Sequence, residues 1–177
     1  MKGVFLIWFW SFVAYSFTGF LLEVAYASAA GGRPDRKGLL VLPLCPVYGL
    51  GACLILLLSQ WVDRWPAALF LLGGLAATAV EYGAGLYHEK VLGVSFWDYG
   101  GLPGSLQGRV CLPFSLVWGV LALALVYGVH PVILPWLRRI PAPVGWAALA
   151  TLLADGLVTA LLLRARGDTA CLRWYER

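Results

Sequence analysis

Charged residues are scarce in this chain. They make up 12% of its 177 residues, against roughly 25% in soluble domains. Hydrophobic residues reach 61% and the mean hydropathy is +0.81. A soluble core could not bury so much apolar surface, which excludes an ordinary soluble domain and favours an integral membrane protein. The net charge of +4 is small and dispersed, so it does not indicate a nucleic-acid partner.

Histidine and patterned cysteine are nearly absent as well. The sequence has two histidines, and its four cysteines show no C-x-x-C or zinc-finger spacing, so we predict no metal site and no cofactor. The phosphate-binding pattern G-x-x-x-x-G-K-[ST] does not occur, and any ATPase that works with this chain would therefore be a separate protein. We interpret the cysteines as free apolar residues in or beside membrane spans: Cys45, Cys53, Cys111 and Cys171.

Long apolar runs are what the sequence has in abundance. A membrane span needs about 20 mostly apolar residues. We predict an all-α, multi-pass bundle that forms one membrane domain over residues 1–177. The first run precedes small residues as a signal peptide would, but it is rich in tryptophan, and Glu23 separates it from them. We therefore interpret it as an uncleaved span. The five predicted spans are 3–22, 39–60, 67–88, 111–136 and 144–163, with a loop at 89–110.

Lysine and arginine are distributed unequally between the two ends of this bundle. Five spans place Lys2, Arg64, Arg138 and Arg139 on one side of the membrane, and the other nine of the 13 Lys and Arg residues on the opposite side. Cytoplasmic loops carry the excess of positive charge. We therefore predict a plasma-membrane protein with its N-terminus outside and its C-terminus inside.

Two segments suggest an internal repeat. GLLVLPLCPVYGLGA (38–52) aligns with GRVCLPFSLVWGVLA (108–122) at an offset of 70, and a glutamate near the end of a span, Glu23 or Glu81, precedes each copy. Two parallel helix pairs followed by a fifth helix would explain the pattern. Chance similarity between apolar helices is the alternative. The glutamates lie 58 residues apart, so the second linker is longer than the first by 12 residues.

Glu23 and Glu81 lie where a negative charge is unfavourable. Each is near the C-terminal end of a predicted helix, where the macrodipole disfavours an anion, and each is near hydrocarbon. Lys37 and Arg109 begin the returning helices, one in each repeat, and are the partners that we expect. The alternative is that both acids reach the headgroup zone and are solvated there.

The longer linker, VSFWDYGGLPGSLQGRVCLP (94–113), holds four glycines and two prolines, which disfavour a helix. Non-helical backbone is tolerated at membrane depth where it is buried in protein or lines a wet cavity. We predict a re-entrant lid in which Asp98 points at Arg109 or Lys37. The alternative is an interfacial loop that Trp97 and Tyr99 anchor to the headgroups.

Proline and glycine also gather at the start of the second predicted span. Pro43, Pro46 and Gly49 indicate a kinked or broken helix there, although close packing through small residues would give the same pattern. Asp155 lies in the middle of the fifth span, where it is either functional or hydrogen-bonded to a neighbouring helix. His130 we interpret as an interfacial histidine at the opposite face.

Three segments resemble one family. They are GFLLEVAY (19–26), KGLLVLPLCPVYGLG (37–51), and EYGAGLYHEKVLGVSFWDY (81–99) continued by GRVCLPFSLVWG (108–119). The chain resembles the CmpB-like family of ABC-transporter type IV permeases, small bacterial multi-span proteins. The resemblance implies a membrane transport component. Lys37 stands where the family has an arginine, so a bidentate role for that cation is not expected.

We therefore predict a permease-like protein that handles a small polar or ionic solute in a cytoplasm-facing polar pocket. We expect it to contact the lipid bilayer, to form a homo-oligomer, and to work with a separate ATPase or other soluble partner. The alternatives are an intramembrane enzyme acting on a lipid or lipid-linked substrate, with Cys111 or Cys45 as nucleophile, and a non-catalytic subunit that docks a soluble partner. The predicted substrate-binding residues are Glu23, Lys37, Glu81, Glu89, Trp97, Asp98, Tyr99 and Arg109. The predicted helix-break residues are Pro43, Pro46, Gly49, Gly108 and Gly119.

Overall fold

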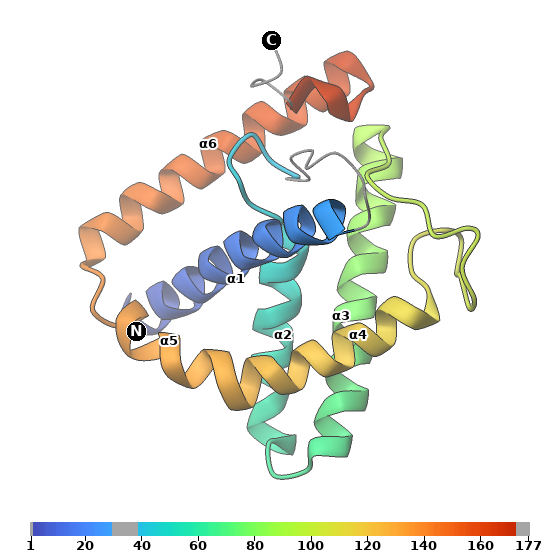
Figure 1. The fold of residues 1–177 in the computed structure, drawn as a ribbon. Helices are drawn as coiled ribbons and strands as arrows, with labels where there is room; N and C mark the ends of the chain where they lie inside the picture. The colour runs from blue at the N-terminus through green and yellow to red at the C-terminus, as the bar shows by residue number, and fades with distance from the viewer. Residues whose placement is uncertain (1, 30–38, 173–177) are drawn as a thin grey trace.

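The computed structural model describes residues 2–29 and 39–172 of the chain. All regular structure in these residues is helical, in an arrangement of five rods (Figure 1). The prediction of an all-α bundle of about five helices is therefore confirmed. The elements are α1 (Lys2–Ala29), α2 (Pro46–Val62), α3 (Pro66–Tyr87) with its π-helical extension η1 (His88–Leu92), α4 (Leu112–Leu123), the π-helical η2 (Ala124–Val129), α5 (His130–Leu137), α6 (Ala142–Arg166) and the 3-10 turn η3 (Thr169–Leu172).

Prolines define where several helices begin. Pro46 and Pro66 are the first residues of α2 and α3, and Pro113 is the second residue of α4. A proline is favoured in the first helical turn because its missing N–H would have no partner there. Pro131 lies instead inside the continuous rod formed by α4, η2 and α5, directly after the π-helical segment.

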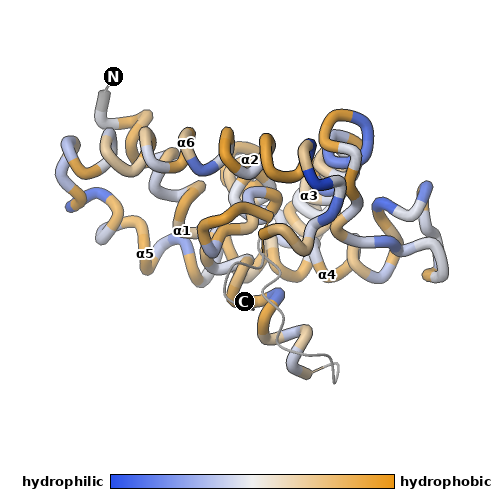
Figure 2. The backbone as a smooth tube through the Cα atoms, turned by 90° about the horizontal axis from the view of Figure 1, so that it is seen from above, coloured by the Kyte–Doolittle hydropathy of each residue, from blue (hydrophilic) through white to orange (hydrophobic). Residues whose placement is uncertain are grey.

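Four helices are long and apolar enough to cross a membrane, and α2 is apolar but shorter at 17 residues. The predicted second span, 39–60, began too early. Residues 39–45 are not helical and α2 starts at Pro46, because a residue that precedes proline avoids the helical conformation. Figure 2 shows apolar residues along most of the helical length, with hydrophilic residues mainly in turns and at helix ends. The four long segments are Gly3–Ala29, Pro66–Leu92, Leu112–Leu137 and Ala142–Arg166.

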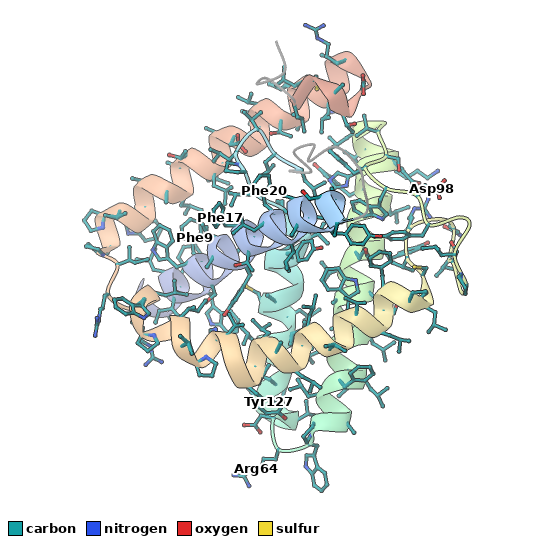
Figure 3. All side chains as sticks on the ribbon, in the orientation of Figure 1. Phe9, Phe17, Phe20, Arg64, Asp98 and Tyr127 are labelled. Atoms are coloured by element: carbon teal, nitrogen blue, oxygen red, sulfur yellow. The ribbon has the colours of Figure 1, made fainter. Side chains whose placement is uncertain are left out.

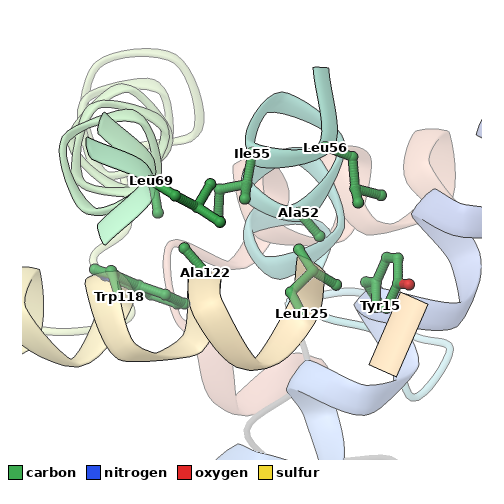
Figure 4. Close-up of a cluster of buried hydrophobic side chains, with 9 residues drawn as sticks. Tyr15, Ala52, Ile55, Leu56, Leu69, Trp118, Ala122 and Leu125 are labelled. Atoms are coloured by element: carbon green, nitrogen blue, oxygen red, sulfur yellow. The ribbon is translucent and has the colours of Figure 1, made fainter. Parts of the chain in front are cut away.

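The core lies where the first four helices meet. Helices α2 and α3 form an antiparallel hairpin, and α1 and α4 both cross it, while α6 runs along the outer side next to α1 (Figure 1). Trp118 and Leu125 of the α4 rod, Ile55 of α2 and Tyr15 of α1 belong to one buried apolar cluster (Figure 4). The cluster comprises Tyr15, Ala52, Ile55, Leu56, Leu69, Ala77, Trp118, Ala122 and Leu125.

Candidate functional site

Glu81 is the most deeply buried acid among the described residues. It lies near the C-terminal end of α3 and is 4% exposed. Its Oε1 accepts a hydrogen bond from the Tyr99 hydroxyl at 3.0 Å, and its Oε2 accepts one from Trp118 Nε1 at 2.9 Å. Within residues 2–29 and 39–172, no cationic side chain lies within ion-pair distance of it. Two neutral donors therefore hold this carboxyl group, one from the loop and one from α4.

Glu23 has a related environment at the end of α1. It is half-buried, and its Oε1 accepts a hydrogen bond from the Tyr48 hydroxyl at 2.7 Å. The Tyr48 ring meets the Trp118 ring edge to face, with 4.9 Å between centroids. The two acids are thus linked through two aromatic rings in contact. We call Glu23, Tyr48, Glu81, Tyr99 and Trp118 the acid–aromatic cluster.

The cluster follows the repeat found in the sequence. Tyr48 and Trp118 occupy equivalent positions at the offset of 70, and each donates to the glutamate that precedes its own copy. The two donors also touch each other, as equivalent residues do when they lie beside a two-fold axis. The contacts therefore match the arrangement of two parallel helix pairs that the alignment suggested.

The glycines of the repeat mark close helix contacts. A Cβ atom on Gly49 would overlap the Ser16 hydroxyl of α1. The glutamate-bearing helices α1 and α3 align at an offset of 58 residues, so Gly74 of α3 corresponds to Ser16 of α1. A Cβ atom on Gly74 would come within 3.3 Å of Gly119 Cα. Gly49 and Gly119 thus lie inside continuous helices at helix–helix contacts. The expectation that they break helices is wrong.

Arg109 pairs with Glu89. It is 8% exposed, and its guanidinium donates to Glu89 Oε2 through NH2 at 2.5 Å and through Nε at 3.1 Å. Its aliphatic stem packs over Gly85, one turn beyond Glu81, where an added Cβ would meet it at 3.3 Å. The hydrogen bond to Glu89 raises the pKa of Arg109. The guanidinium therefore stays charged and is neutralised outside the acid–aromatic cluster.

Asp98 does not point at Arg109, and the prediction that it does is wrong. Its side chain is exposed, and its Oδ1 accepts a hydrogen bond from the Gly100 backbone N–H at 2.8 Å. Short acidic side chains commonly bond the backbone two residues ahead, which satisfies them locally. Figure 3 places Asp98 in the loop at the edge of the molecule. The other expected partner, Lys37, lies outside the described residues.

The rest of the Trp-Asp-Tyr run faces the bundle. Trp97 Nε1 donates to the Arg109 carbonyl at 2.8 Å, and the Tyr99 N–H donates to the Gly108 carbonyl at 2.7 Å. Gly108 has φ +73°, in the left-handed region that favours glycine. Phe96 and Trp97 also pack on the buried cluster around Cys45.

The base of the loop therefore packs on the bundle, whereas most of its tip, residues 100–107, is exposed. Tyr99 reaches from this base to Glu81. Burial raises the pKa of the Tyr99 hydroxyl above its ordinary value of 10.0, which keeps it protonated as a donor.

The first linker is held by α6, a contact that was not predicted. The Leu42 N–H donates to Asp155 Oδ1 at 3.0 Å, and the Val41 N–H donates to Thr159 Oγ1 at 3.1 Å. Asp155 and Thr159 are four residues apart and so share one face of α6. Asp155 thus has a structural contact, and its spacing from Thr159 is the signal that could have found it. Pro43 follows this anchored stretch and Pro46 begins α2.

The histidines and cysteines do not form a reactive centre in the described part of the chain. No three His, Cys, Asp or Glu side chains there gather in a way that could hold a metal ion. His130 Nδ1 lies 2.7 Å from the Tyr15 hydroxyl, joining α5 to α1. Cys45 and Cys111 are the residues before α2 and α4 and are 2% and 1% exposed. Such burial is typical of structural cysteines and does not favour a nucleophile.

A family model described as "Putative ABC-transporter type IV" matches residues 10–161. The matched range contains the whole acid–aromatic cluster and the Arg109–Glu89 pair. No curated protein matches the chain, and no solved structure matches it.

Proposed function

Because the chain belongs to the family described as "Putative ABC-transporter type IV", we propose that it is the membrane permease subunit of a transport system and that it moves a small cationic solute. The observation that carries the proposal is the environment of Glu81. Its carboxyl group is buried, is held by two neutral donors, and meets no cation of the described chain.

A buried carboxylate can bind a cation if its lone pairs are free. A carboxylate offers about four lone-pair sites, and Tyr99 and Trp118 use two of them. A lone charge at hydrocarbon depth costs several kcal/mol, which two hydrogen bonds offset in part and a bound cation would offset further. The rings of Tyr48 and Trp118 lie beside the two carboxyl groups, and aromatic faces attract ammonium groups.

Transport by a permease of this class needs an energy source and partners. The chain lacks the phosphate-binding motif of ATPases, so a separate subunit would hydrolyse ATP. Helix α6 buries 11% of its most apolar window, which leaves a long face for a second copy of the chain or for lipid. The excess of Lys and Arg beside the loop supports an orientation in which the acid–aromatic cluster opens toward the cytoplasm.

The test is the charge displacement that accompanies cation binding, which needs neither ATP nor a partner subunit, in proteoliposomes on a solid-supported membrane after rapid addition of sodium, potassium, ammonium or choline ions. We expect at least one ion to give a signal with the unmodified protein, and Glu81→Gln to reduce that signal at least tenfold. The matched control is Asp63→Asn, which neutralises an exposed acid at the α2–α3 turn. Helical content and elution volume check that each variant is folded. A wild-type signal from Glu81→Gln would overturn the proposal, as would the absence of any signal from the unmodified protein.

A further inference from the structure

An apolar cavity of about 110 Å³ lies between α1, α2, α3 and the rod of α4 and η2. Its inner wall includes Ile55 and Ala77, which are 3% and 2% exposed. Its outer wall includes Leu22 and Val129, which are 41% and 42% exposed. The cavity therefore leads from the surface of the bundle into the core.

The wall of the cavity favours an apolar occupant, because every polar side chain in it already has a hydrogen-bond partner. Tyr48 and Trp118 donate to the two glutamates of the cluster. The Tyr15 hydroxyl pairs with the ring of His130, and Thr18 donates to the carbonyl of the preceding turn. A buried water needs two to four polar partners, and this wall offers only the remaining lone pairs of three hydroxyl groups, those of Tyr15, Thr18 and Tyr48. An apolar occupant therefore fits this wall best.

The mouth of the cavity opens at hydrocarbon depth. Thr18 and Leu22 lie in the C-terminal half of the apolar segment Gly3–Ala29, before its end. Ala124 and Val129 lie in the interior of the apolar segment Leu112–Leu137. The residues exposed at the mouth are mostly apolar, since Leu22 and Val129 are 41% and 42% exposed and Ala124 is exposed as well. The mouth is thus continuous with the surface that the bundle presents to the bilayer.

One wall of the mouth is formed by η2, the π-helical segment Ala124–Val129. A π-helical turn is wider than an α-helical turn and is found frequently at functional sites. The small side chain of Ala124 leaves the entrance open. The unusual backbone of this rod therefore coincides with the opening of the cavity.

We propose that an acyl chain of a membrane lipid enters through this mouth and occupies the cavity. Its inner end would lie against the rings of Tyr48 and Trp118, next to the two carboxyl groups. An engineered apolar cavity of about 150 Å³ holds a benzene molecule, so by proportion this one takes about four carbon atoms of a chain. The assignment does not depend on the transport of a cation.

The test is photo-crosslinking of the full chain in nanodiscs of phosphatidylcholine that carries a diazirine near the methyl end of one acyl chain. Adducts are assigned to single residues by tandem mass spectrometry. We expect adducts on Ile55 and Ala77, which lipid at the outer surface cannot touch. Ala124→Phe, which fills the mouth, should reduce them at least fivefold. Ala150→Phe on the exposed face of α6 should leave them unchanged.

Leu153 and Leu157, 66% and 62% exposed on α6, serve as reference sites that lipid labels in every variant. If Ala124→Phe is not recovered folded, Val129→Trp narrows the same mouth from the next turn. Labelling of the reference sites without any adduct on Ile55 or Ala77 would overturn the proposal. Interior labelling that neither mouth variant reduces would overturn it as well.

Discussion

The two helix pairs of the bundle, α1–α2 and α3–α4, have the same arrangement but bury their glutamates to different degrees. In both pairs, the second helix carries an aromatic donor, Tyr48 or Trp118, that binds the glutamate near the end of the first helix. Glu23 is half-buried and has this one donor among the described residues, whereas Glu81 is 4% exposed and has a second donor, Tyr99. The extra donor comes from the longer second linker. The longer second linker therefore adds a donor that the described part of the first pair lacks and encloses the carboxyl group of Glu81.

The largest expected difference between the halves is in the stability contributed by the two aromatic donors. Trp118 is 8% exposed in the main core cluster, so Trp118→Ala should cost about 3–5 kcal/mol. Tyr48 is half-buried, and Tyr48→Ala should cost about half as much. Unfolding in mixed micelles with increasing dodecyl sulfate measures both. Equal losses would mean that the two halves enclose their donors to the same degree.

The next largest effect separates the two hydroxyl donors. Tyr99→Phe should cost about 1–3 kcal/mol, because the buried carboxyl of Glu81 loses a partner that water cannot replace. Tyr48→Phe should cost less than Tyr99→Phe, because half-exposed Glu23 can recruit water. Tyr26→Phe is the matched control on an exposed face and should change stability by less than about 0.5 kcal/mol. If Tyr48→Phe lowered the free energy of unfolding more than Tyr99→Phe, Glu23 would depend on its donor more than Glu81 does.

The last comparison is between the two charged residues of the second linker, of which Asp98 should give the smallest effect of all. Asp98→Ala should change stability by less than about 0.5 kcal/mol, because the side chain is exposed and bonds the adjacent backbone. Arg109→Met should cost about 1.5–3 kcal/mol, because the charge-assisted bonds to Glu89 are lost. The same micelle unfolding assay compares them. If Asp98→Ala were as damaging as Arg109→Met, Asp98 would be part of the ion pair after all.

Hydropathy was enough to predict the helices, but not where each begins. The apolar run at 39–60 contains no polar residue that would mark its non-helical start, and only the two prolines indicate it. The predicted site named Glu23 and Glu81 as acids that need partners and assigned cations to them, whereas their described partners are tyrosine hydroxyl groups and, for Glu81, an indole as well. Charge complementarity is readable in a sequence, whereas a hydroxyl or indole that donates across a helix contact leaves no spacing pattern.

The internal repeat contained the information that identifies the donors to the two glutamates. Tyr48 and Trp118 were aligned at the offset of 70, each after its own glutamate, and that pairing is what the structure contains. Asp98 was misplaced for a local reason, since its bond to the Gly100 backbone competes with any distant partner. The expectation for Lys37 lies outside the described residues and stays a prediction.

We expect the deeply buried glutamate, Glu81, to recognise the cation, and the half-buried one, Glu23, not to replace it. Proteoliposomes of Glu81→Gln and Glu23→Gln, prepared in parallel, should be compared by charge displacement with whichever ion gives a signal in the unmodified protein. We predict that Glu81→Gln loses at least 90% of the signal, while Glu23→Gln keeps most of it. Equal signals from the two variants, or a larger loss in Glu23→Gln, would contradict the account.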